Sequence, residues 1–314
     1  MPSKDCACKG IRTCLLCEDT IKRDNQSVKV PLVEFIYCWK CGNKAFLSSE
    51  FEAHFLNHET SNSAIKDDEG TVLSIDGVYL QEEVLTKEEE SHLISSIDSF
   101  GWNDSQSGRR KQDFGPKINF KKKKINFTSF YGLPQLDMKL LERIKKERLR
   151  DDANCTKFST ISSDVLEKDT SASVLCNFKT VEVCHLEYCP ERGSSIDPHF
   201  DDFWIWGERL VTLNLLSSTV ITLTIAEAER KLAQLNYCIR ISLPPRSLLV
   251  LYGDARHRYE HSIRRADITD RRLAITYREL PATFLDPTSD DYQRIGKEFI
   301  SRAEVLLIEP QRPQ

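Results

Sequence analysis

Hydrophobic and polar positions change their periodicity about halfway along this chain. From Val174 onward, short runs of β-branched and apolar residues follow one another closely, and turn residues separate most of them. Many short strands with little helix between them favour a sandwich or barrel over strand-helix-strand units. The predicted strands are Val181 to Tyr188, Arg209 to Ser217, Val220 to Ile225, Tyr237 to Leu243, Ser247 to Tyr252, Arg256 to Ile263 and Arg271 to Leu280.

Helical patterns flank this β-rich part. Thr86, with Glu89 three residues later, forms a capping box ahead of an apolar face, which predicts the start of a helix. The stretch from Thr71 to Tyr79 is strand-like, and residues 101 to 131 are irregular and basic. Two further helices are expected, at Leu133 to Arg150 and, packed on the outside of the sheet, at about Asp290 to Leu307.

Composition fits three units in one globular protein. The 314 residues are 40% hydrophobic and 29% charged, which excludes wholesale disorder. Six of the 11 cysteines fall within the first 41 residues, where long apolar patterns are few. We therefore expect a small metal-folded region at 1–60, an extension with helices and a basic lid at 71–173, and a β core with a C-terminal helix at 174–314.

The chain carries no predicted membrane segment and no predicted signal peptide. Its apolar runs are far shorter than the roughly 18 to 20 residues that a bilayer requires, and Met1 to Gly10 is polar. We expect a location in the cytoplasm and nucleus. The net charge of −4 gives no overall field that would recruit nucleic acid, so such a partner must be bound by a local patch.

Two cysteine clusters in the first 60 residues have the spacing of zinc ligands. Cys38 and Cys41, then His54 and His58, match a finger with two cysteines and two histidines. The helix positions of this finger that would face DNA bases are poor major-groove readers, so it more plausibly folds its neighbourhood or docks a protein. A weaker four-thiol set, for which reduced free thiols are the alternative, consists of Cys6, Cys8, Cys14 and Cys17.

A third constellation lies in the β-rich half. His199 and Asp201 are two residues apart, so at a strand end both side chains leave the same face and can bind one metal. His261 is the best distant third ligand, and His257 competes with it. Two histidines and one carboxylate on one face of an octahedron are the ligand set of non-haem Fe(II) oxygenases.

Arginines on the last predicted strand add to this pattern. At a period of two, Arg272, Thr276 and Arg278 share one face of the strand. Two inward arginines require anions as partners, and a dicarboxylate co-substrate would supply them. A solvated strand face is the alternative.

These features resemble the AlkB-like Fe(II)- and 2-oxoglutarate-dependent dioxygenases. The pattern of that family is His-x-Asp, a distal His, then Arg and a second Arg six residues later, and further similarity lies in Cys6 to Cys17, Ser105 to Lys117 and Tyr188 to Arg209. The resemblance implies a mainly β fold, a double-stranded β-helix or jelly roll with flanking helices. It also implies oxidative N-demethylation with Fe(II) as cofactor and 2-oxoglutarate as co-substrate, beside the Zn(II) expected at the N-terminus.

The resemblance also assigns residue roles. His199, Asp201 and His261 would hold Fe(II), Arg272 the distal carboxylate of 2-oxoglutarate, and Tyr188 and Arg278 would help to bind that co-substrate. Two positions depart from the family pattern, because Leu186 and Ala274 stand where asparagines are expected. They motivate an alternative function, a catalytically weak zinc-organised adaptor or nucleic-acid-binding protein with an oxygenase-like fold.

The segment from Gln106 to Phe130 is the expected substrate lid. It holds eight basic residues and one acid, among them Arg109, Arg110, Lys111 and the run Lys121 to Lys124. The segment is either a solvated basic loop without a binding role, or a patch that binds phosphates or an acidic protein surface. The resemblance implies methyl-lysine on actin, or on actomyosin, as the leading substrate, with N6-methyladenine in DNA as the second.

Overall fold

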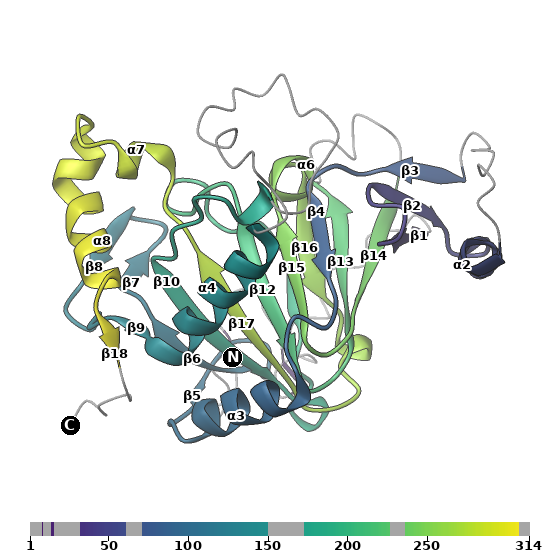
Figure 1. Ribbon diagram of the computed structural model, residues 1–314, viewed down its shortest axis with the longest axis horizontal. Helices are drawn as coiled ribbons and strands as arrows, with labels where there is room; N and C mark the ends of the chain where they lie inside the picture. The colour runs from purple at the N-terminus through teal and green to yellow at the C-terminus, as the bar shows by residue number, and fades with distance from the viewer. Residues whose placement is uncertain are drawn as a thin grey trace.

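A computed structural model describes residues 32–60, 71–149, 173–226 and 236–307, together with Cys8, Cys14 and Leu15. Within these ranges the fold is mainly β, as the sequence predicts, with two seven-stranded sheets (Figure 1). The assignment as a jelly roll stays a prediction. No helix in the described ranges combines the length and the apolar character that a membrane span requires.

The first sheet contains the strands of the predicted metal ligands and extends into the N-terminal region. Its strands pair antiparallel except for β1 and β14, which run parallel. In sheet order they are β11 (Ile196–His199), β16 (Tyr259–Ile263), β13 (Thr219–Ile225), β14 (Tyr237–Leu243), β1 (Val33–Cys38), β2 (Lys44–Leu47) and β3 (Val72–Ser74). The cysteine-rich region therefore shares a sheet with the β core.

The second sheet is antiparallel throughout and contains the arginine strand. In order, its strands are β4 (Val78–Gln81), β15 (Ser247–Leu251), β12 (Leu210–Leu215), β17 (Arg272–Arg278), β10 (Glu182–Tyr188), β6 (Arg110–Phe114) and β5 (Asn103–Asp104). Two small sheets join β9 (Leu133–Pro134) to β18 (Leu306–Leu307) and β7 (Lys117–Asn119) to β8 (Lys124–Asn126).

Helices cover the outer face of the second sheet, where α3 and α4 cross in front of its strands in Figure 1. The α-helices are α2 (Phe51–Thr60), α3 (Lys87–Asp98), α4 (Gln135–Leu149), α6 (Gly253–His257), α7 (Ala282–Leu285) and α8 (Lys297–Ala303). Shorter turns are the 3-10 helices η2 (Ser173–Leu175), η3 (Pro190–Arg192) and η4 (Arg265–Asp267), and the π-helix η5 (Tyr292–Gly296). The predicted capping box is present, because Thr86 and Glu89 exchange hydrogen bonds at the start of α3.

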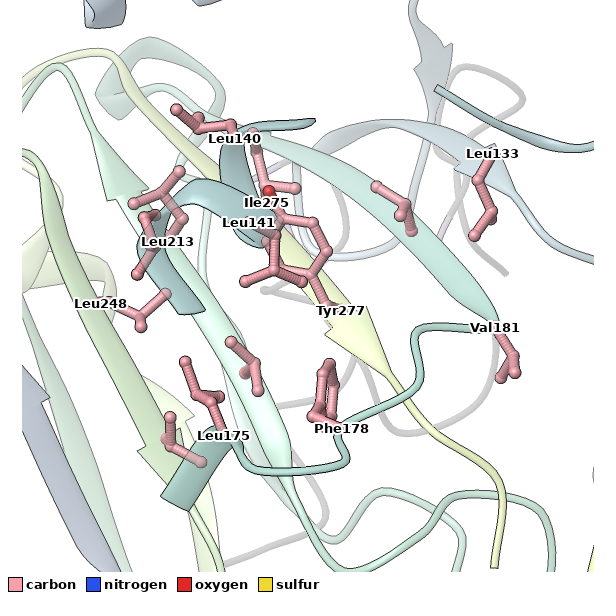
Figure 2. Packing of buried hydrophobic residues seen from close by; sticks show 14 of the residues in the cluster. Leu133, Leu140, Leu141, Leu175, Phe178, Val181, Leu213, Leu248, Ile275 and Tyr277 are labelled. Carbon is pink, nitrogen blue, oxygen red and sulfur yellow. The ribbon is translucent and has the colours of Figure 1, made fainter. Parts of the chain in front are cut away.

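Alternating side chains of the second sheet build two apolar cores. On β15, Leu248 and Val250 pack under the helices, whereas Leu249 and Leu251 point between the two sheets. Figure 2 shows the helix-side core, in which Leu213, Leu248 and Tyr277 of the sheet lie among residues of α4 and the 173–181 segment. The inter-sheet face of β17 is left for Arg272, Ala274, Thr276 and Arg278, so this strand presents its polar groups to the space between the sheets.

Three sequence-based expectations are wrong in detail. The predicted strand from Arg256 to Ile263 begins as α6, because Gly253 in the left-handed region (φ 48°) turns the chain into a helical turn before β16. Residues 101–131 form the short strands β5 to β8. The C-terminal helix ends at Ala303, since Leu306 pairs with Leu133 in a strand.

Candidate iron and co-substrate site

Strand pairing brings the three predicted iron ligands together. His199 at the end of β11 is the direct cross-strand partner of His261 on β16, and their ring centroids lie 4.2 Å apart. Asp201 follows two residues after β11 ends, with Oδ1 3.7 Å from His199 Nε2. One ligand atom from each residue falls within 4.8 Å of the others. This set of two imidazoles and one carboxylate fits Fe(II) with open coordination positions.

The two imidazoles are prepared for binding metal. His199 Nδ1 lies 2.8 Å from the carbonyl oxygen of Asp197, so donation from Nδ1 leaves Nε2 facing Asp201 as a ligand. Burial, and then the neighbouring His199, lower the pKa of His261 from 6.5 to about 3. His261 is therefore neutral near pH 7, which is the form that binds a metal.

Arg278 supports Asp201. Its Nε donates to Asp201 Oδ2 at 2.7 Å, and its Nη1 donates to Glu182 at 2.5 Å. Burial would raise the pKa of Asp201, but the charge of Arg278 holds that pKa well below its ordinary value of 3.8. Arg278 thus keeps the carboxylate ionised and oriented, and its expected contact with 2-oxoglutarate stays a prediction.

His257, the competing candidate, lies apart from the three-ligand cluster. Its Nε2 is 2.9 Å from Glu208 on a largely exposed surface, and its ring stacks on Phe203 with centroids 5.2 Å apart. The structure therefore favours His261 as the distal ligand.

Arg272 fits the distal carboxylate of a dicarboxylate. Its side chain is 1% exposed, its Nε donates to Asn214 Oδ1 at 2.6 Å, and its guanidinium lies 4.7 Å from the centre of the Tyr188 ring. Its Nη1 has no hydrogen-bond partner among the described residues. A buried N–H donor without an acceptor is destabilising, unless a bound ligand accepts its hydrogen bond. A carboxylate is a suitable acceptor for a guanidinium. Sequence reasoning missed Asn214, whose only signal is its position on the inter-sheet face of β12.

The two departures from the family pattern face each other. Leu186 of β10 and Ala274 of β17 are direct cross-strand partners. Both are apolar, so the floor of the site between Arg272 and Arg278 offers no amide donor at these positions.

The three basic residues predicted to bind substrate have other partners in the structure. Arg109 is 6% exposed and donates from Nε to the carbonyl oxygen of Gln106. Arg110 pairs with Glu187 through two hydrogen bonds, and Lys111 pairs with Asp113 at 2.7 Å. Their role in binding substrate stays a prediction. It would require each side chain to bind substrate in addition to its present partner, or in place of it.

Glu187 is the centre of an ion-pair network that sequence reasoning missed. Its carboxylate is 1% exposed and accepts hydrogen bonds from Arg110, Arg192 and Arg271 at 2.5 to 2.9 Å. Burial alone would raise its pKa, but the bonds from Arg110 and Arg271 outweigh burial and lower that pKa from 4.5 to about 2. The network joins β6, β10, η3 and the turn just before β17, beside the co-substrate site.

We expect this network to make stability depend on pH. Because the folded pKa of Glu187 lies below the unfolded one, its contribution is present above about pH 4.5 and is lost as pH falls toward about 2. Glu187→Gln should lower the free energy of unfolding at neutral pH by about 2 kcal/mol, less than a fully buried pair because the arginines are about one third exposed. Urea unfolding at several pH values checks both statements. Glu191→Gln, at an exposed position nearby, is the control, and an equal effect of both variants would contradict the assignment.

Part of the predicted zinc finger is assembled at the other end of the first sheet. Cys38, Cys41 and His54 offer ligand atoms within 4.8 Å of one another, and Cys41 Sγ lies 3.4 Å from His54 Nε2. Phe46 stacks on the His54 ring at 3.5 Å, and Gly42 (φ 81°) makes the turn after the second cysteine. This donor set fits Zn(II). His58 lies on α2, and its side chain is outside the described residues.

The second cysteine cluster is described only in part. Cys8 and Cys14 are buried against each other, and the backbone N–H of Ser107 donates to Cys8 Sγ at 3.0 Å. Cys6 and Cys17 lie outside the described residues, so zinc binding by this set stays a prediction. The contact with Ser107 places Cys8 against the first turn of the predicted lid.

Comparison with known proteins identifies the family. No family model matches the chain. Three curated relatives match it over nearly all of their own lengths. Two are named alpha-ketoglutarate-dependent dioxygenase alkB homolog 4: the human protein is 37% identical over 95% of this chain and 92% of its own length, and the mouse protein 34% over 96% and 94%. A Caenorhabditis elegans protein named DNA N6-methyl adenine demethylase is 31% identical over 96% of this chain and 95% of its own.

Among solved structures, "The structure of OsALKBH1" matches over 65% of this chain and 98% of its own length, with 14% identity and a TM-score of 0.41. The three sequence relatives agree with the expected resemblance to the AlkB-like dioxygenases. The chain belongs to the AlkB family of 2-oxoglutarate-dependent dioxygenases.

Proposed function

We propose that this dioxygenase removes N-methyl groups from lysine side chains of a protein, with actin as the expected substrate, and that it is active in the cytoplasm and nucleus. The main support for oxidative demethylation is the cluster of His199, Asp201 and His261, together with the Nη1 of Arg272, which has no hydrogen-bond partner among the described residues. The names of the relatives favour this enzyme over the adaptor alternative.

The residues of the site have separate tasks. When bound, Fe(II) with 2-oxoglutarate would supply the oxidation, in which dioxygen, 2-oxoglutarate and the N-methyl group give succinate, carbon dioxide, formaldehyde and the free amine. Arg272 and Tyr188 would fix the distal end of 2-oxoglutarate. Arg278 keeps Asp201 ionised, and the carbonyl of Asp197 orients His199.

A basic hairpin beside the site supports an acidic partner. Lys121 to Lys124, at the β7–β8 turn, are all exposed. The hairpin begins at Gly115, where a Cβ would lie 2.6 Å from the Glu182 side chain, and Glu182 pairs with Arg278, which pairs with Asp201. The hairpin thus leaves the sheet close to the iron ligands, and an acidic protein surface would complement it.

N6-methyladenine in DNA is the second candidate. The nematode relative is named for that activity, and the same lysines would grip phosphates.

We expect formaldehyde release from monomethyl-lysine actin to exceed release from methyladenine oligonucleotides. Changing Lys121 to Lys124 to Ser should raise the KM for the protein substrate about 10-fold, because long-range attraction is lost while the metal site is untouched. Release of formaldehyde from each substrate is the measurement, at low and at physiological salt.

The matched control changes two exposed lysines of α4, Lys139→Ser with Lys146→Ser, and should leave both reactions unchanged. Turnover confined to the oligonucleotide, and lost in the hairpin variant, would replace methyl-lysine with methyladenine as the substrate.

A further inference from the structure

The turn at the start of the predicted lid is buried and has an unusual backbone conformation. It spans Gln106 to Arg109, and the N–H of Arg109 donates to the carbonyl oxygen of Gln106 at 3.3 Å. Ser107 (φ 55°) and Gly108 (φ 70°) both lie in the left-handed region, and Ser107 is 0% exposed. A left-handed serine persists only where its surroundings hold it there, so the contacts of this turn identify what holds it.

One set of contacts comes from the loop of residues 189–195, which contains η3. Three hydrogen bonds of 2.7 to 3.1 Å run to the carbonyl oxygens of Ser107 and Gly108 from Ser195 N–H, Ser194 Oγ and Arg192 Nε. The loop connects Tyr188, at the end of β10, to β11, which ends at His199. The 106–109 turn is therefore fixed on the loop between an expected co-substrate residue and an expected iron ligand.

The N-terminal cysteine segment supplies the other contacts. Cys8 Sγ accepts a hydrogen bond from the backbone N–H of Ser107 at 3.0 Å, and Cys8 and Cys14 are buried against each other. Leu15, the neighbour of Cys14, packs on Gly193, where a Cβ would lie 2.3 Å from Leu15 Cγ. The segment thus contacts both the 106–109 turn and the 189–195 loop, and it lies where the two meet.

The contact with Cys8 has the chemistry of a metal-bound thiolate. A neutral thiol is a weak acceptor, whereas an ionised acceptor forms a stronger hydrogen bond. Ser107 Oγ is also buried and has no hydrogen-bond partner among the described residues, which leaves a second donor on the residue that contacts Cys8. Thiolates side by side in the interior require a cation, and Zn(II) is suited to sulfur ligands whose outer partners are such donors.

Arg109 connects the turn to the co-substrate site. It is largely buried, and its Nε donates back to the carbonyl oxygen of Gln106. Its guanidinium carbon lies 5.8 Å from the centre of the Tyr188 ring, and that of Arg272 lies 4.7 Å from the same ring. Two cations near one ring restrict where the ring can lie.

We propose that Zn(II) bound by Cys8 and Cys14 holds the 106–109 turn, and that the turn, through Arg109, positions Tyr188 for the distal carboxylate of 2-oxoglutarate. Cys8 and Cys14 are then positioning residues for co-substrate binding. The proposal rests on the part of the proposed function in which Tyr188 and Arg272 hold 2-oxoglutarate, and it is independent of the demethylated substrate.

The test compares the full-length wild type with Cys14→Ser. Both are loaded anaerobically with Fe(II), and 2-oxoglutarate or pyruvate is titrated while the visible charge-transfer absorption of the iron complex is followed. Pyruvate keeps the chelating carboxylate and lacks the distal one. Cys14→Ser should lose one zinc, keep its iron and bind 2-oxoglutarate about 10-fold more weakly, the worth of one hydrogen bond, while its affinity for pyruvate is unchanged.

Hydrogen exchange provides a second measurement that needs no co-substrate. In Cys14→Ser, the amides of residues 105–109 and 189–195 should exchange faster than in the wild type. Cys238→Ser is the matched control, because it changes a buried thiol of β14 outside both cysteine clusters, and it should alter neither zinc content, exchange in these segments nor affinity.

Unchanged affinity for 2-oxoglutarate after the loss of one zinc would overturn the proposal, and so would equal weakening of 2-oxoglutarate and pyruvate. Failure of the wild type to bind 2-oxoglutarate would instead refute the co-substrate assignment, and faster exchange in Cys14→Ser would still support a zinc-held turn. If Cys14→Ser does not fold, the Cys38→Ser chain, which keeps the upstream zinc, is chelated and resupplied with Zn(II). Exchange at 105–109 should then rise and fall reversibly, and constant exchange would refute the proposal.

Discussion

His199→Ala and Asp201→Ala are each expected to abolish iron binding while the protein stays folded. Each variant removes one of three protein ligands, and the loss should exceed about 100-fold, because partners outside the ligand set alone contribute about 10- to 100-fold to metal affinity. The fold should survive because these side chains lie outside both apolar cores, which hold the sheets together. Iron stoichiometry after anaerobic loading, together with the melting temperature, provides the measurement.

The choice of the distal histidine has its own control. His261→Ala should behave like the other two ligand variants, whereas His257→Ala should keep iron, since it removes only the surface contact with Glu208. Loss of iron from the His257 variant with retention in the His261 variant would show that the cluster in the structure is not the iron site.

Removal of zinc is expected to have the second large effect. We propose that the full chain binds two zinc ions, one at Cys38, Cys41, His54 and His58 and one at the upstream thiols. A structural zinc site contributes about 10–16 kcal/mol to the folding of its region, so chelation should release β1, β2 and α2 from protection against hydrogen exchange. The second sheet should stay protected, because its pairing and its helix-side core do not involve this region.

Single cysteine variants separate the two zinc sites. Cys38→Ser and Cys14→Ser should each leave one zinc per chain, measured by elemental analysis. Cys238→Ser, at a buried thiol outside both clusters, should leave two. Retention of two zinc ions in the Cys38 variant would contradict the finger, and one zinc in the wild type would mean that the upstream thiols bind none.

Features that depend on neighbouring residues were predicted better than features that depend on the pairing of distant segments. Thr86 with Glu89 gave the start of α3, and β10 and β12 to β15 fall within two residues of their predicted bounds, because helix caps and strand periodicity depend on neighbouring residues. The short strand β11 was not predicted. His199 and Asp201 were recognised as candidate iron ligands because their spacing is itself local. Their distant partner His261 needed the family pattern to separate it from His257.

The features that sequence reasoning missed depend on contacts between distant segments. Glu187 lies 77 positions from Arg110 and 84 from Arg271, so no window of the sequence displays their network. Arg256 was predicted to begin a strand, but the turn at Gly253 places it on α6, and the strand begins at Tyr259. The guanidinium of Arg256 has no hydrogen-bond partner among the described residues. This is a property of the packed interior, and the sequence alone does not show it.

The parallel pairing of β1 with β14 has a consequence for synthesis on the ribosome. Val33 pairs with Tyr237, so β1 emerges about 200 residues before its partner, a delay of roughly 10–40 s at about 5–20 residues per second. During that interval the hydrogen-bonding edge of β1 that later faces β14 is open to other nascent chains. Early metal capture by Cys38 and Cys41 would hold β1 and β2 as a folded hairpin during that wait, so zinc supply during translation should govern the yield of soluble protein.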